Sequence, residues 1–141
     1  MAAVVVGLDV GGTKILGRAV STAAPTEVLV EERVETPVGP VALLDELTGV
    51  VRRLQGRLVE VGRSEAAAVG VGVPALVDRG GVIRFATHLA GTTGLAVGQE
   101  LTGRLGLAVT VDNDANCAAL AEARVGAGAG AGDAAGGSLR T

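Results

Sequence analysis

Short apolar runs at the start of the chain predict three strands. Ala3–Leu8 is a run rich in β-branched residues that stops just before Gly11 and Gly12, and a second such run, Ile15–Val20, follows. Two strand-like runs around a Gly-Gly pair predict a β-hairpin. Residues Val28–Thr36 alternate between apolar and polar side chains, which predicts a third strand.

The next segment has the periodicity of an amphipathic helix. Its apolar residues recur at steps of three and four positions, the spacing that places them on one helical face. These residues are Leu44, Leu47, Val51, Leu54, Leu58 and Val61. Pro40 suits the first turn of such a helix, and Gly62 suits its C-terminal end.

The remaining pattern completes an alternation of strands and helices. It predicts a buried strand at Ala66–Val73, a small hairpin arm at Val82–Phe85 after the turn Asp78–Gly81, a helix at Val97–Leu105, a strand at Ala108–Val111 and a helix at Asp114–Val125. The order is therefore three strands, helix, strand, irregular loop, helix, strand, helix. Such an order predicts an α/β domain in which helices pack against a mixed sheet.

Composition limits the number of domains. With 141 residues, of which 48% are hydrophobic and 19% charged, the chain suffices for one domain with an aliphatic core, which excludes wholesale disorder. We assign the domain to residues 1–125. Residues 126–141 alternate mainly between Gly and Ala, and we expect them to form a linker or the start of a further part.

Charge and residue usage exclude several classes of function. The net charge of −3 and the single aromatic residue, Phe85, argue against nucleic acid as a partner. No apolar run reaches the roughly 18–20 residues of a membrane span, so we expect no membrane partner and a cytoplasmic location. One cysteine, Cys117, permits no internal disulfide, and together with one histidine, His88, it cannot form a structural zinc site.

The first glycine turn has the chemistry of a phosphate site. Gly7–Lys14 comes close to the Walker A pattern but ends in Thr-Lys, and a strand follows it instead of a helix, so a P-loop NTPase is disfavoured. Side-chain-free Gly11 and Gly12 would let backbone N–H groups approach phosphate oxygens, with Thr13 and Lys14 as further donors. Asp9, at the end of the strand, would face a hydrated Mg²⁺. A plain hairpin turn is the alternative interpretation of the Gly-Gly pair.

Two later segments are candidates for a cleft. Gly70–Ala75 satisfies the loose dinucleotide pattern, but Pro74 and the pair Gly80-Gly81 prevent the helix that a dinucleotide site needs. We interpret it as a strand that leads into a loop lining a cleft. His88, in the loop Ala86–Gly91, is placed to bond a substrate hydroxyl, although a lone loop histidine is often only a surface residue.

Asp112–Asn116 concentrates polar side chains where a strand meets a helix. Helix capping, for which Asn and Asp are preferred, accounts for one of these residues and not for four. A carboxylate here is ionised at neutral pH and has the chemistry of a general base toward a hydroxyl group. For the neighbouring Cys117, a small buried apolar role is favoured over a chemical one.

Taken together, these motifs resemble the ROK family of sugar kinases and sugar-responsive repressors, within the hexokinase–actin (ribonuclease H-like) fold class. The resemblance rests on four motifs in order across residues 4–128: Leu8–Lys14, Gly70–Asp78, Thr87–Leu89 and Asp112–Asn116. It implies a mixed sheet with flanking helices that forms the N-terminal lobe of a two-lobed protein. Family members continue into a second lobe, so we expect this chain to correspond to the N-terminal lobe and to bind ATP poorly by itself.

The resemblance also implies roles for single residues. Asp114 would be the base that accepts the proton of the sugar hydroxyl as that hydroxyl attacks the γ-phosphate of ATP. The sugar would be held by Asn113, His88, Thr87 and the loop at Ala75, and the phosphates by Gly11, Gly12, Thr13 and Lys14, with Asp9 near Mg²⁺. Ala75 replaces a frequent glycine, and His88 replaces a frequent asparagine, so the identity of the hexose stays open.

Three functional hypotheses follow from the resemblance. The leading one is an ATP-dependent, glucokinase-like hexose kinase, impaired in a chain of this length and homo-oligomeric when full length. The second is the sugar-sensing lobe of a ROK-type transcriptional repressor. The third is a fragment without catalytic activity.

Overall fold

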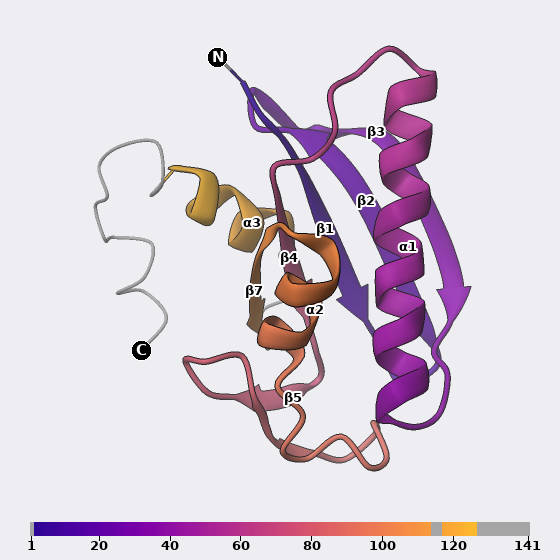
Figure 1. The fold of residues 1–141 in the computed structure, drawn as a ribbon, viewed down its shortest axis with the longest axis vertical. Helices are drawn as coiled ribbons and strands as arrows, with labels where there is room; N and C mark the ends of the chain where they lie inside the picture. Colours follow the sequence, from indigo (N-terminus) through magenta and orange to yellow (C-terminus); the bar gives the residue numbers. More distant parts are fainter. Residues whose placement is uncertain (1, 114–116, 127–141) are drawn as a thin grey trace.

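The computed structural model describes residues 2–113 and 117–126, the last four of them by their backbone alone (Figure 1). The strands are β1 (Val4–Val10), β2 (Lys14–Ser21), β3 (Ala24–Glu35), β4 (Ala68–Gly72), β5 (Ala75–Val77), β6 (Ile83–Ala86) and β7 (Ala108–Asp112). The helices are α1 (Pro40–Glu60), α2 (Val97–Leu105) and α3 (Cys117–Gly126). Among the described residues no helix is long and apolar enough to cross a membrane.

Five strands form one mixed sheet in the order β3-β2-β1-β4-β7. β1 and β2 form the predicted antiparallel hairpin, and β3 continues it, whereas β4 pairs with β1 and β7 pairs with β4 in parallel. β5 and β6 form a separate two-stranded antiparallel ribbon. The expected α/β domain with a mixed sheet is therefore confirmed.

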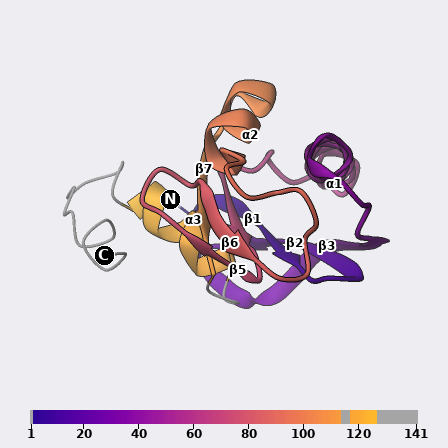
Figure 2. The same ribbon diagram turned by 90° about the horizontal axis from the view of Figure 1, so that it is seen from below.

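Helices cover both faces of the five-stranded sheet: α1 and α2 lie on one side and α3 on the other (Figure 2). On the first side, the buried stripe of α1 meets alternate residues of β1 and β2. The stripe is Leu43, Leu44, Leu47, Val50, Val51, Leu54 and Leu58. Five of its residues are those that the three-and-four spacing predicts, Leu43 and Val50 are additional, and the stripe is part of the main core of the domain.

α3 lies against the backbone of the sheet. Gly7 of β1 and Gly70 of β4 are neighbours in the register, and both face this helix. A Cβ atom at Gly7 would lie 2.7 Å from the backbone nitrogen of Ala118, and one at Gly70 would overlap the carbonyl oxygen of Cys117. Since no side chain fits between helix and sheet at these two positions, the glycines determine how closely α3 approaches.

Most predicted elements match the structure, with shifts at their ends. The helix at Val97–Leu105 is confirmed, and α1 begins at Pro40 as expected, after a glycine with φ of +102° at position 39. Val61, however, was predicted on the apolar helical stripe; it follows α1 and is 58% exposed. β3 begins at Ala24, before the predicted start, because its first residues pair with β2 across a register shift that the side-chain pattern does not reveal. The proposed start of the last helix, Asp114, and the proposed linker, 126–141, fall outside or at the limit of the described residues.

Candidate functional site

The candidate site lies at the carboxyl ends of the three parallel strands. There the register aligns Asp9 of β1 with Gly72 of β4, and Gly72 with Asp112 of β7. Ligand sites of open α/β sheets lie at this end of the strands. Two strand spacings separate the two aspartates, about 10 Å between their backbones.

Asp9, Gly72 and Asp112 all belong to the sheet face covered by α3, because side chains alternate along each strand and Gly7 and Gly70 also face that helix. Gly72, between the two aspartates, is buried and adds no side chain to this face. The Asp9 carboxylate is exposed, and no hydrogen bond or ion pair to it is found within residues 2–113 and 117–126. Mg²⁺ is usually held by one or two carboxylates and keeps several waters. The residues present fit such an ion, with Asp9 as the ligand.

The first glycine turn joins β1 to β2 at the same end. Its backbone is closed by one hydrogen bond, in which the Gly11 N–H donates to the Lys14 carbonyl at 2.7 Å. Gly12 and Thr13 are exposed, and within the described part of the chain their N–H groups make no hydrogen bond. Two successive unbonded N–H groups in a turn are suited to an anion.

The predicted phosphate contact Lys14 points elsewhere in the structure. Its Nζ lies 3.8 Å from a carboxylate oxygen of Glu35 on the neighbouring strand β3, and both side chains are mostly exposed. Exposed ion pairs of this kind contribute little, about 0–1 kcal/mol. The pair therefore presents only a small barrier to Lys14 turning toward a phosphate.

The loop after β4 bonds to Asp112 at the end of β7 and leads to Ala75, next to the predicted sugar-contacting loop. The Val73 N–H donates to the Asp112 carbonyl at 2.9 Å, and the Ala75 N–H donates to the Val73 carbonyl at 2.9 Å. Ala75 then pairs with Ala86 at the end of β6. Because Thr87 and His88 follow Ala86 directly, the predicted sugar-contacting residues Ala75, Thr87 and His88 come together.

His88 also borders the glycine turn. A Cβ atom at Gly12 would lie 3.3 Å from the His88 Cβ, so the loop carrying His88 packs directly on the turn. Leu89 is buried behind it, and the Thr92 hydroxyl donates to the Leu89 carbonyl at 2.7 Å. These contacts hold the loop while Thr87 and His88 remain exposed.

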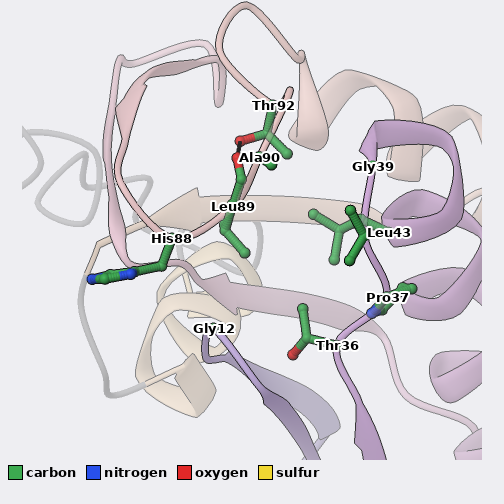
Figure 3. Close-up of a pocket in the computed structure, with 10 residues that line it drawn as sticks. Gly12, Thr36, Pro37, Gly39, Leu43, His88, Leu89, Ala90 and Thr92 are labelled. Carbon is green, nitrogen blue, oxygen red and sulfur yellow. Dashed lines mark hydrogen bonds between the residues drawn. The ribbon is translucent and has the colours of Figure 1, made fainter.

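A small pocket of about 90 Å³ opens between this loop, the glycine turn and the residues that precede α1 (Figure 3). Gly12, Thr36, Leu43 and Leu89 are among its lining residues. The imidazole ring of His88 points away from the apolar side chains of the pocket (Figure 3). His88 therefore lines the pocket, while its polar ring lies on the exposed side of the loop.

The acidic segment is only partly described. Asn113 is exposed, and its N–H donates to Oδ1 of Asp112 at 2.7 Å. Asp114, predicted as the catalytic base, lies outside the described residues together with Ala115 and Asn116. α3 begins at Cys117, which is buried against Gly7 and Gly70. The role of Asp114 as the catalytic base therefore stays a prediction.

Asp78, the last residue of the Gly70–Asp78 motif, organises the turn of the β5–β6 ribbon. One carboxylate oxygen accepts hydrogen bonds from the N–H groups of Gly80 and Val82, and the other contacts Arg84 at 2.7 Å. The Val82 hydrogen bond and, to a lesser degree, Arg84 lower the pKa of Asp78 below its ordinary value. Its visible role is to shape the ribbon that carries Ala75 and Thr87.

Thr36 is a residue of the site that the local sequence pattern does not indicate. It follows β3, and its hydroxyl donates to the Gly11 carbonyl at 2.8 Å. Its only local signal is the Thr36-Pro37 pair, since a residue before proline is held in an extended conformation. Nothing in the local pattern indicates which distant group the hydroxyl meets.

The chain belongs to the ROK family, whose model matches residues 5–139. Among proteins similar to it is the N-acetyl-D-glucosamine kinase of Photobacterium profundum, which is 35% identical over 118 residues, or 83% of this chain and 37% of the kinase. The chain thus spans little more than a third of the length of this relative.

Solved structures support the fold. The ROK family glucokinase of Streptomyces griseus in complex with glucose and AMPPNP is 31% identical, with a TM-score of 0.69, over 89% of this chain and 38% of the glucokinase. A ROK family transcriptional regulator, a homologue of the E. coli MLC protein, shares the fold at 17% identity and a TM-score of 0.67, over 77% of this chain and 27% of the regulator. The domain therefore has the actin-like fold of ROK hexokinases, as the sequence predicts.

Proposed function

We propose that this chain is the N-terminal lobe of an ATP-dependent hexose kinase, with residues 1–125 as the lobe and 126–141 as the connection onward. The observation that carries the proposal is the direct packing of the His88 loop on Gly12. It brings a phosphate-type turn and a candidate sugar loop together at one end of the parallel strands. The family and the sugar kinases among its relatives support the same conclusion.

In the proposed reaction, Asp114 takes the proton from the sugar hydroxyl as its oxygen attacks the γ-phosphorus of ATP, and ADP leaves. Asn113, His88, Thr87 and the backbone at Ala75 hold the hexose. The N–H groups of Gly12 and Thr13 and the Lys14 ammonium bind phosphate oxygens. Asp9 would hold Mg²⁺, which would neutralise part of the phosphate charge. Phosphoryl transfer depends mainly on positioning and charge stabilisation, which this set of groups provides.

The proposal also covers the location, the partners and the oligomeric state of the protein. We place the protein in the cytoplasm, with sugar and ATP as its small-molecule partners and without nucleic acid or membrane partners. We propose that it is homo-oligomeric when both lobes are present. Since the isolated lobe holds one side of the cleft, we expect it to bind ATP weakly and to have impaired activity.

A chimera tests this function. Residues 1–125 replace the corresponding part of the similar N-acetyl-D-glucosamine kinase, and ADP release is measured with glucose, mannose, fructose and N-acetylglucosamine. We expect sugar-dependent ADP release, and a loss of about 10²–10⁴-fold on Asp114→Asn because the general base is removed. The matched control is Asp45→Asn, an exposed α1 carboxylate paired with Arg104. A folded chimera whose ADP release survives Asp114→Asn would contradict the proposed base.

A further inference from the structure

The glycine turn is held by a residue of another strand. The Thr36 N–H donates to the Thr13 carbonyl at 2.9 Å, and the Thr36 hydroxyl donates to the Gly11 carbonyl at 2.8 Å. Among the residues that the structure describes, no other side chain makes a hydrogen bond to residues 11–13. Thr36 therefore fixes the first and the last carbonyl of this three-residue segment at once.

Fixing the Gly11 carbonyl also fixes the Gly12 N–H. The two groups belong to one planar trans peptide, in which the C=O and the N–H point in opposite directions. Because the Gly11 carbonyl points at the Thr36 hydroxyl, the Gly12 N–H points away from Thr36. Gly12 is exposed, and its N–H makes no hydrogen bond within the described ranges. The Thr36 hydroxyl thus orients a free donor outward from the turn.

Two adjacent glycines would otherwise leave this peptide free to rotate, since glycine loses more backbone entropy on ordering than any other residue. The neighbourhood opposes that rotation from two sides. Pro37 restricts Thr36 to an extended backbone, and His88 packs against Gly12. Thr36 and Gly12 both line the small pocket, where the Thr36 side chain lies close to the turn (Figure 3).

We propose that Thr36 is a positioning residue for phosphate binding: its hydroxyl orders the Gly11–Gly12 peptide and so presents the Gly12 N–H to a phosphate oxygen. The proposal rests on the proposed function, because it takes the turn as the phosphate site. Thr36 itself touches no phosphate. Removal of the Thr36 hydroxyl should therefore make the turn less ordered, and the less ordered turn should bind phosphate more weakly.

The test uses three variants of the 141-residue chain. Thr36→Val keeps the shape and loses the hydroxyl, and Thr36→Ser keeps the hydroxyl. Thr48→Val is the matched control, since it removes a hydroxyl that bonds the Leu44 carbonyl inside α1 at 2.7 Å, away from the turn. For each variant, ¹⁵N relaxation at the Gly12 and Thr13 amides is measured without ligand. The dissociation constant for inorganic tripolyphosphate is then measured by titration of the same amides.

We expect Thr36→Val to increase the mobility of the Gly12 amide and to weaken tripolyphosphate binding by about three- to tenfold, the effect of losing one hydrogen bond. Thr36→Ser should stay within about twofold of the parent chain, as should Thr48→Val. Unchanged Gly12 relaxation in Thr36→Val would overturn the proposal, as would equal losses in Thr36→Val and Thr48→Val. Since weak binding is expected of this lobe, the titration is carried to the highest soluble tripolyphosphate concentration. If the parent chain shows no shifts at Gly12 even there, the phosphate role of the turn is wrong, and with it the role of Thr36 in binding. The relaxation data then still decide whether Thr36 orders the turn.

Discussion

The two faces of the sheet are filled in opposite ways. On one face, long aliphatic side chains of α1 fill the space above β1 and β2. On the other, α3 touches the strand backbones at Gly7 and Gly70, and the buried cluster there consists of small or short side chains such as Val5, Ala68 and Ala121. Large side chains fill the first face. On the second face, the lack of side chains at Gly7 and Gly70 allows the helix to approach the sheet.

This difference matters because the candidate site is attached to the second face. α3 begins at Cys117, directly after the segment that contains Asp112 and Asn113. A shift of α3 away from the sheet would move that segment relative to Asp9 and the glycine turn. We therefore expect the α1 face to supply most of the stability, and the packing of α3 to influence the position of Asp112 and Asn113.

The largest expected effect is on the α1 face. Leu54 is fully buried and packs above Gly17 of β2. Leu54→Ala should lower the free energy of unfolding by about 2–5 kcal/mol, the transfer loss plus the cavity left behind. Denaturant titration measures this change in the free energy of unfolding. A loss below about 1 kcal/mol would show that this face is not the main core.

Addition of volume should be harmful on the α3 face. Gly70→Ala places a methyl group on the Cys117 carbonyl and 2.7 Å from the Ala121 nitrogen, so α3 must move. We expect a loss of about 1–3 kcal/mol, together with shifted amide resonances at Asp112 and Asn113. The control is Gly56→Ala in α1, where a new Cβ meets nothing within 4 Å. That variant should gain about 0.5–1 kcal/mol from helix formation. Equal changes in the free energy of unfolding for Gly70→Ala and Gly56→Ala would show that close packing of α3 on the sheet does not limit side-chain volume at Gly70.

A smaller effect is expected at Thr110, on the α3 face of β7. Its hydroxyl is buried, and among the described residues it has no hydrogen-bond partner. Thr110→Val removes that desolvated group without changing the shape of the side chain. We expect the free energy of unfolding to rise by up to about 1 kcal/mol in denaturant titration. A clear loss of stability would instead reveal a contact made by the hydroxyl.

The smallest effect is expected in the β5–β6 ribbon, which belongs to neither face of the main sheet. The pKa of Asp78 is lowered first by the Val82 hydrogen bond, so the ionised form stabilises the turn. This contribution is present above the unfolded pKa of about 3.9 and is lost as the pH falls through the lower folded value. The Gly80 and Val82 amide shifts should follow that titration. Asp78→Asn should abolish it, and a midpoint above the ordinary value would contradict the assignment.

Much of the fold follows from local patterns. The Gly-Gly pair between two apolar runs suffices for the β1–β2 hairpin, and the spacing from Leu44 to Leu58 suffices for α1. The beginning of β3 does not follow, since Ala24 and its neighbours pair with β2 through a register shift that tertiary contacts stabilise. Periodicity predicts Val61 on the helical stripe, because periodicity alone does not tell where a helix ends.

The candidate site divides in the same way. By itself, the sequence determined which residues have the chemistry: glycines for a phosphate turn, Asp9 for a cation, His88 and Asn113 for hydroxyls. Only the tertiary structure decided that Asp9, Gly72 and Asp112 share one row, that His88 packs on Gly12 and that Thr36 reaches Gly11. The physical reason is that residue type sets which bonds a group can form, whereas strand register and helix packing, which join distant parts of the chain, set which partners are within reach.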